Sequence, residues 1–102
     1  MLSLPICAPT RIATSGAVSA KPGRIWAVLL NGGSDDTSIE FTNDATGLGT
    51  NVFELEATCT TGTASDKDSK YISFVDIGGV AFSTKCYAAL TGTAATAYVW
   101  YA

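Results

Sequence analysis

Gly23-Arg24-Ile25-Trp26-Ala27-Val28-Leu29-Leu30-Asn31-Gly32-Gly33 is the longest apolar run in this chain. Turn-forming residues mark both of its limits, with Pro22-Gly23 at the start and Asn31-Gly32-Gly33 at the end. An apolar run of this length, containing Ile, Val and Trp, predicts a buried strand, because a helix is usually longer. Since successive side chains of a strand point to opposite sides, we expect two apolar faces. One carries Ile25, Ala27 and Leu29, and the other carries Trp26, Val28 and Leu30. One face meets the core of the domain, and the other needs a second cover.

The rest of the chain predicts more short strands, separated by Gly-, Asn-, Asp- and Ser-rich turns. We expect them at residues 11–20, 37–43, 51–60, 70–77, 80–90 and 95–101. Apolar and polar residues alternate most regularly in two of them. The side chains expected to point inward there are Ile39 and Phe41 in one, and Phe53, Leu55, Ala57 and Cys59 in the other. In 80–90 the inward set is Val80, Phe82, Cys86, Ala88 and Leu90.

Seven or eight strands spaced about ten residues apart are typical of an all-β protein. We therefore predict an antiparallel two-sheet β-sandwich, similar to a jelly roll. The 102 residues suit one domain. We assign residues 11–102 to the sandwich and residues 1–10 to an extended N-terminal arm, because Pro5 and Pro9 prevent a helix there.

The composition argues against several partners. The net charge is −3 and the chain has no basic cluster, so binding to nucleic acid is not expected. No apolar run approaches the roughly 20 residues that span a bilayer, so no membrane partner is expected. Charged residues make up only 15% of the chain, against about 25% usually, and a surface with few charges is easier to bury against another protein. The N-terminus lacks the basic start of a secretion signal, since its first base is Arg11.

The three cysteines form no recognisable disulfide framework and no zinc-binding spacing. Their odd number and wide separation favour reduced, mostly buried thiols in a protein made in a cytosol. A bridge between Cys59 and Cys86 remains an alternative.

The sequence predicts no catalytic residues, no cofactor and no metal site. The chain has no histidine, which is the commonest general base and a usual metal ligand. Its acidic pairs, Asp35-Asp36 and Asp66 with Asp68, are expected in solvated turns, with weak calcium binding by the second pair as an alternative. Glu54 and Glu56 project from one strand to the same side, so they cannot flank a sugar as glycosidase carboxylates do. We interpret them as a stripe that faces solvent or a neighbouring subunit.

Four aromatic residues allow three interpretations: Trp26, Tyr98, Trp100 and Tyr101. They are core residues, a protein interface, or a platform on which sugars stack. The arm also allows two. Its apolar Leu2, Leu4 and Ile6 fit an arm that lies across a neighbouring subunit, or a disordered terminus.

The order of several motifs resembles small virion proteins of tailed bacteriophages, particularly β-sandwich capsid decoration (cement) proteins. The motifs are the strand PGRIWAV at 22–28, NGG at 31–33, TNDATG at 42–47, GGVAF at 78–82 and the terminal TGTAATAYVWY at 91–101. Related repeats also look like domains of tail and head-fibre proteins. The resemblance covers residues 21–102 and leaves residues 1–20 outside it. Its motifs are strands and turns rather than a chemical signature, so it bears on fold more than on role.

The resemblance implies a protein made in the host cytoplasm that sits on the outer surface of the phage head. It would bind the major capsid protein, bridge neighbouring capsid subunits and form a homotrimer. The alternative that the resemblance leaves open is a tail or head-fibre adhesion module that binds a host surface glycan. The candidate interface residues from this reading are Leu2, Leu4, Ile6, Trp26, Glu54, Glu56, Tyr98 and Trp100.

Overall fold

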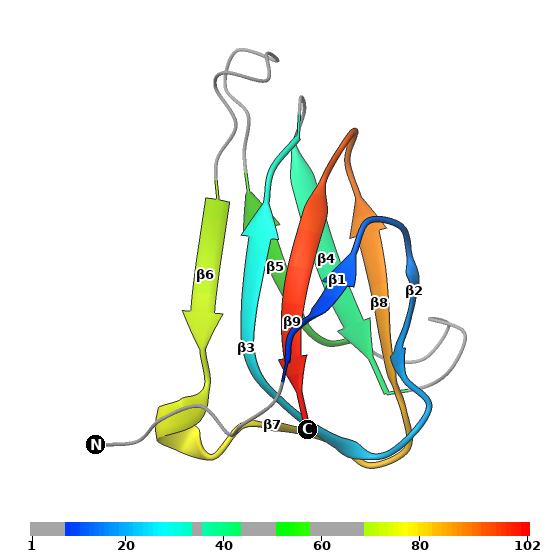
Figure 1. Cartoon of the computed structure of the whole chain (residues 1–102), viewed down its shortest axis with the longest axis vertical. Coiled ribbons are helices and arrows are strands. Elements are labelled where there is room, and N and C mark those ends of the chain that lie inside the picture. The colour runs from blue at the N-terminus through cyan, green and yellow to red at the C-terminus, as the bar shows by residue number, and fades with distance from the viewer. Residues whose placement is uncertain (1–7, 34–35, 44–50, 58–68) are drawn as a thin grey trace.

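A computed structural model describes residues 8–33, 36–43, 51–57 and 69–102, and within them it contains two antiparallel β-sheets and no α-helix. Sheet A has the order β1-β9-β3-β6, with β7 also paired to β3. Its strands are β1 (Thr10–Ile12), β9 (Thr96–Tyr101), β3 (Gly23–Asn31), β6 (Ser69–Ser73) and β7 (Val80–Phe82). Sheet B has the order β2-β8-β4-β5. Its strands are β2 (Gly16–Ser19), β8 (Cys86–Thr91), β4 (Thr37–Thr42) and β5 (Asn51–Ala57). The two sheets form the layers seen in Figure 1, and the predicted all-β sandwich is confirmed.

Strand β3 is the centre of sheet A. It pairs with β9 along one side, and with β7 and then β6 along the other. The register against β9 shifts between Ile25 and Ala27, which is a β-bulge. Because of the bulge, Ile25, Val28 and Leu30 all point into the core and are 0% exposed. The strict alternation predicted for this strand is therefore wrong: the extra residue changes the face on which the later side chains lie.

The core lies between the sheets and consists of aliphatic, aromatic and small side chains from both. Its buried members are Ile12, Ile25, Val28, Leu30, Ile39, Phe41, Ala57, Phe82, Cys86, Ala88, Ala97 and Val99. The inward positions predicted for β4 and for β5 up to Ala57 are confirmed. Phe41 and Phe53 stack between β4 and β5, with ring centroids 4.7 Å apart.

Two predicted strands are each divided between the sheets. Residues 11–20 form β1 in sheet A and β2 in sheet B, and residues 80–90 form β7 in sheet A and β8 in sheet B. The inward phase predicted for the second stretch is still correct, because both halves face the same core. Periodicity reports the buried face but not the sheet to which it belongs.

Polar side chains hold the chain where it changes sheets. The Ser15 hydroxyl, between β1 and β2, accepts a hydrogen bond from the Leu90 amide at 2.9 Å. Between β7 and β8, Asn43 Oδ1 accepts from the amides of Thr84 at 2.9 Å and Lys85 at 3.3 Å. Asn43 Nδ2 also donates to Ser83 Oγ at 2.8 Å. One asparagine thus supplies the partners that residues 83–85 lack in either sheet.

The strand predicted at 70–77 ends early. Strand β6 stops at Ser73, and a short 3₁₀ helix, η2 (Val75–Ile77), precedes Gly78 and Gly79. Several predictions fall outside the described residues. They concern Leu2, Leu4, Ile6, Cys7, Asp35, Cys59, Asp66, Asp68 and the loops at 44–50 and 58–68. Within the described part of the chain, no helix is long and apolar enough to cross a membrane.

Candidate functional site

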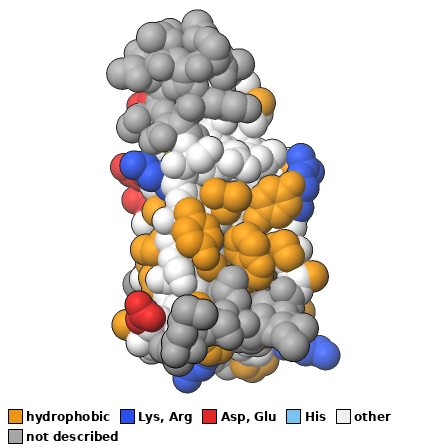
Figure 2. All heavy atoms as spheres, turned by 60° about the vertical axis from the view of Figure 1, so that its left-hand side comes forward, with side chains coloured by type: hydrophobic (Ala, Val, Ile, Leu, Met, Phe, Trp, Pro, Cys, Tyr) orange, Lys and Arg blue, Asp and Glu red, His pale blue; other side chains and the backbone are white. Residues whose placement is uncertain are grey.

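The outer side of sheet A carries an uncovered group of apolar and aromatic side chains, which we call the aromatic face. Its members point away from the core because their strand neighbours point into it. They are Leu29, Tyr71, Tyr98 and Trp100, and Ala27 lies on the same side of β3 but is fully buried. Tyr71 is 57% exposed, and Leu29, Tyr98 and Trp100 are half-buried. Figure 2, which brings the β6 side forward, shows hydrophobic side chains gathered into a patch there.

The strand register places these side chains in rows across the sheet. Leu29 of β3 lies opposite Tyr71 of β6 on one side and opposite Tyr98 of β9 on the other. Tyr98 in turn lies opposite Arg11 of β1. The row Tyr71–Leu29–Tyr98–Arg11 therefore crosses four strands, at about 4.8 Å per strand. Trp100 belongs to the next row, opposite Ala27.

Ring geometry decides what this face can bind. The rings of Tyr71 and Trp100 lie 6.4 Å apart with an interplanar angle of 87°. An edge-to-face pair is favourable in itself, but it presents two perpendicular planes rather than one. A flat sugar chain therefore cannot stack on both rings at once. This uneven apolar surface fits a protein partner better than it fits a sugar chain.

The four aromatic residues that the sequence analysis grouped together lie in different parts of the structure. Tyr98 and Trp100 lie on the aromatic face. Tyr101 instead packs against the core, with its ring 6.2 Å from that of Phe82, and its hydroxyl donates to the Lys21 carbonyl oxygen at 2.6 Å. Trp26 lies at the bulge of β3, half-buried. Its Nε1 is buried, and no acceptor among the described residues hydrogen-bonds it.

The outer side of sheet B is acidic. Glu40 of β4 lies directly opposite Glu54 of β5, and Glu56 follows on the same side. We call these three residues the acidic face. The protonated Glu54 carboxyl donates a hydrogen bond to Glu40, and this bond, desolvation, and the charges of Glu40 and Glu56 together raise the pKa of Glu54 above its ordinary value of 4.5. The predicted outward direction of Glu54 and Glu56 is confirmed, but the structure places them on the opposite face of the sandwich from Tyr98 and Trp100.

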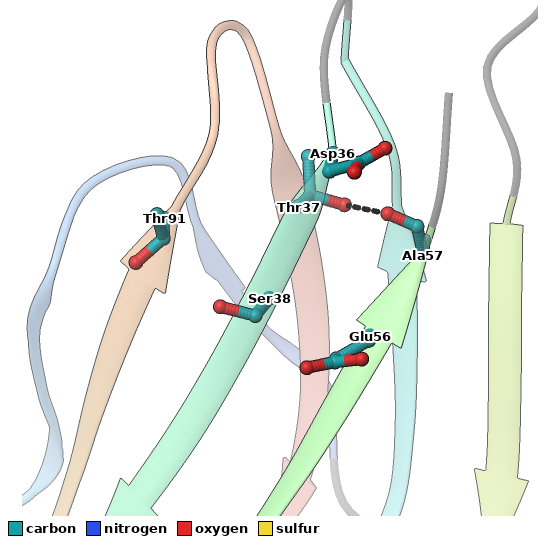
Figure 3. Close-up of a pocket in the computed structure, with 6 residues that line it drawn as sticks. All are labelled: Asp36, Thr37, Ser38, Glu56, Ala57 and Thr91. Carbon is teal, nitrogen blue, oxygen red and sulfur yellow. Dashed lines mark hydrogen bonds between the residues drawn. The ribbon is translucent and has the colours of Figure 1, made fainter. Parts of the chain in front are cut away.

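A hollow of about 260 Å³ lies near one end of the acidic face (Figure 3). Its lining comes from β4, β5 and β8 and the residue before β4: Asp36, Thr37, Ser38, Glu56, Ala57 and Thr91. The Thr37 hydroxyl is already engaged, since it donates to the Ala57 carbonyl oxygen at 3.2 Å. The other polar side chains of the lining are the carboxylates of Asp36 and Glu56 and the hydroxyls of Ser38 and Thr91, and Ser38 lies opposite Glu56.

The described residues contain no group of three or more His, Cys, Asp or Glu that could hold a metal ion. Cys86 is a free thiol in the core, and burial raises its pKa to about 12. A thiol with so high a pKa is a poor nucleophile, because the thiolate is the reactive form.

Sequence reasoning missed Tyr71 as an interface residue. The signal was present, since Ile72 points inward and its neighbour must then point outward. Leu29 was assigned to an apolar side of its strand but not to a site. Its position between two tyrosines depends on strands that lie about 40 and 70 residues apart from it, and only the register shows this.

Comparison of the chain with protein-family models, with curated proteins and with solved structures finds no match.

Proposed function

We propose that this chain is a capsid decoration protein of a tailed bacteriophage, and that it acts by binding rather than by catalysis. The observation that carries this proposal is the aromatic face. Leu29, Tyr98, Trp100 and Tyr71 lie outside the core of this small sandwich, on one outer surface. The first three are half-buried and Tyr71 is 57% exposed. Aromatic residues supply much of the binding energy of protein interfaces. The resemblance of residues 21–102 to phage virion proteins supports the same proposal.

The physical mechanism is linkage. A ligand that binds one state of an assembly and not another stabilises the state it binds. Many copies, each burying a modest apolar area across the joints between major capsid protein subunits, would oppose expansion of the head by the packaged DNA. In this proposal, Leu2, Leu4 and Ile6 of the arm contact the capsid, and the sandwich forms the homo-oligomer, a trimer by resemblance.

The copy number of the chain in purified virions tests the proposal. Quantitative mass spectrometry of particles of the encoding phage gives its ratio to the major capsid protein. We expect a ratio near one to one or a simple fraction of it. When heads and tails are separated, we expect the chain to remain with the heads. Absence from the particle would overturn the proposal.

Removal of the arm tests how attachment occurs. The sandwich begins with β1 at Thr10, so a chain that lacks residues 1–8 keeps every described strand. We expect this variant to melt like the full chain but to bind capsids more weakly. Equal binding by both chains would contradict a role for the arm.

A glycan-binding adhesion module is the second candidate, and the exposure of Tyr71 favours it. The perpendicular rings of Tyr71 and Trp100 weigh against an extended sugar platform. A handful of copies per particle, located in the tail, together with hits on a glycan array that disappear in Tyr71→Ala, would favour adhesion over decoration.

A further inference from the structure

Charge is segregated between the two sheets. Among the strands that the structure describes, every charged residue of sheet A is a cation and every charged residue of sheet B is an anion. The cations are Arg11, Arg24 and Lys70, and the anions are Glu40, Glu54 and Glu56. These six residues lie in five of the nine strands, and the other charged residues that the structure describes, Lys21, Asp36, Asp76 and Lys85, lie between strands. The strands therefore give the two surfaces opposite charge.

Two of the cations, Arg11 and Arg24, lie on the same side of sheet A as the aromatic face, whereas Lys70 is paired with the core residue Leu30 and lies on the other side. Arg11 ends the row that contains Tyr98, Leu29 and Tyr71, and its side chain is exposed. Arg24 lies on the same side of β3, and its Nη1 donates to the Gly78 carbonyl oxygen at 3.1 Å. A surface of aromatic rings bordered by arginines is the composition found at the centre of protein interfaces.

The acidic face holds like charges together. Glu40 and Glu54 are directly opposed across β4 and β5, and a pair of like charges in this position destabilises a sheet. No Lys or Arg of the strands of sheet B offsets them within the described residues. A cationic partner that covers this face would convert the repulsion into attraction.

We propose that the aromatic face of one copy of this chain packs on the acidic face of a second copy, with Arg11 and Arg24 directed at Glu40, Glu54 and Glu56. Both complementary surfaces are present in the same chain. Two aromatic faces in contact would place arginines against arginines, and two acidic faces would place glutamates against glutamates. The contact is therefore heterologous: each copy uses one face and offers the other to the next copy. Because the two faces lie on opposite sides of the sandwich, this contact builds a stack and is separate from any contact that closes a trimer.

The size of the surface sets the expected strength. Four strands of about six residues make a face of roughly 15 Å by 20 Å. This is smaller than the roughly 800 Å² per partner of a standard stable interface. Association is then dependent on concentration, and salt weakens it because its charges are solvent-accessible.

The inference rests on the proposed function in one respect, since both treat the aromatic face as an interface. Sedimentation velocity of the full chain at low salt, from about 5 µM to about 500 µM, tests it without a phage. We expect the average sedimentation coefficient to rise with concentration, and to rise less in about 0.5 M salt. A chain that stays monomeric over the whole range overturns the inference, even if the chain is abundant in virions.

Charge reversal identifies the faces. We expect Arg11→Glu and Glu54→Lys each to shift association to about tenfold higher concentration, and an equimolar mixture of the two to restore it, because both contacts of the mixed assembly are complementary. Tyr71→Ala should also weaken association, and mixing it with either charge-reversal variant should not restore association. The control is Lys21→Glu. Lys21 is an exposed lysine outside the strands, and its replacement changes the net charge as Arg11→Glu does, so this variant should associate like the unmodified chain.

Normal association of Arg11→Glu, or mixed chains that remain apart, would refute the pairing of these faces. If the chain self-associates but does not bind virions, that result refutes the decoration proposal and leaves the inference about self-association standing.

Discussion

The charged form of Glu54 lowers the free energy of unfolding of the isolated chain. Its hydrogen bond with Glu40, its desolvation and the neighbouring charges raise its pKa above 4.5, so the folded state holds the proton more tightly than the unfolded state. The free energy of unfolding therefore falls as the pH rises from the ordinary pKa through the raised one, and the cost is fully present above it.

We expect Glu54→Gln to melt at a higher temperature than the unmodified chain at about pH 7, and to lose this advantage at about pH 4. Thermal melts of both chains at several pH values check this. Glu56→Gln is the control, because Glu56 lies opposite Ser38 rather than a second carboxylate. A gain in melting temperature that is the same at every pH would contradict the explanation.

Gly79 is constrained by both its backbone and its neighbours. Its φ is +83°, a conformation that residues with a Cβ rarely adopt. A Cβ there would lie 3.1 Å from the Arg24 Cβ and 3.3 Å from Trp26 Cδ2. Gly78, next to it, has a similar φ of +81° but nothing within 4 Å of its Cβ position.

Gly79→Ala should lower the free energy of unfolding by about 2–3 kcal/mol, and Gly78→Ala by about 1–2 kcal/mol. The difference between the two variants measures the close packing of the turn against β3. Chemical denaturation gives both values. Equal losses would show that the backbone conformation alone matters at Gly79.

At the scale of elements, the crossing from β7 to β8 is one of the places where the chain moves from sheet A to sheet B. Asn43 holds this crossing through both polar atoms of its side chain. Asn43→Ala removes all three hydrogen bonds and should cost about 1–3 kcal/mol. Asn43→Asp keeps the acceptor for Thr84 and Lys85 and should cost less. Denaturant titration of the two variants checks the order, and an Asp variant as unstable as the Ala variant would contradict it.

At the scale of the whole molecule, the sandwich keeps its core and its proposed interface apart. Phe41 is 0% exposed between the sheets, whereas Tyr71 and Trp100 lie outside them. Phe41→Ala should cost about 3–5 kcal/mol. Tyr71→Ala should cost less than about 1 kcal/mol when measured on dilute, monomeric protein, yet it should weaken association. Unfolding and sedimentation measured on the same samples separate the two effects. A Tyr71 variant that unfolds as easily as the Phe41 variant would make the aromatic face part of the core.

The sequence by itself determined the fold class, the central strand β3 and the inward phase of β4 and β5, because burial imposes a local period of two on the side chains. It also identified Tyr98, Trp100, Glu54 and Glu56 as residues of interest. It could not assign them to opposite faces, because that depends on where the chain crosses between sheets, and on the bulge in β3. These are set by long-range contacts such as those of Asn43 and by the pairing of β3 with β9. The tertiary structure alone decided that Tyr71 joins Leu29 and Tyr98 in one row, and that cations and anions lie on different sheets, since register and strand order are properties of the assembled sheets.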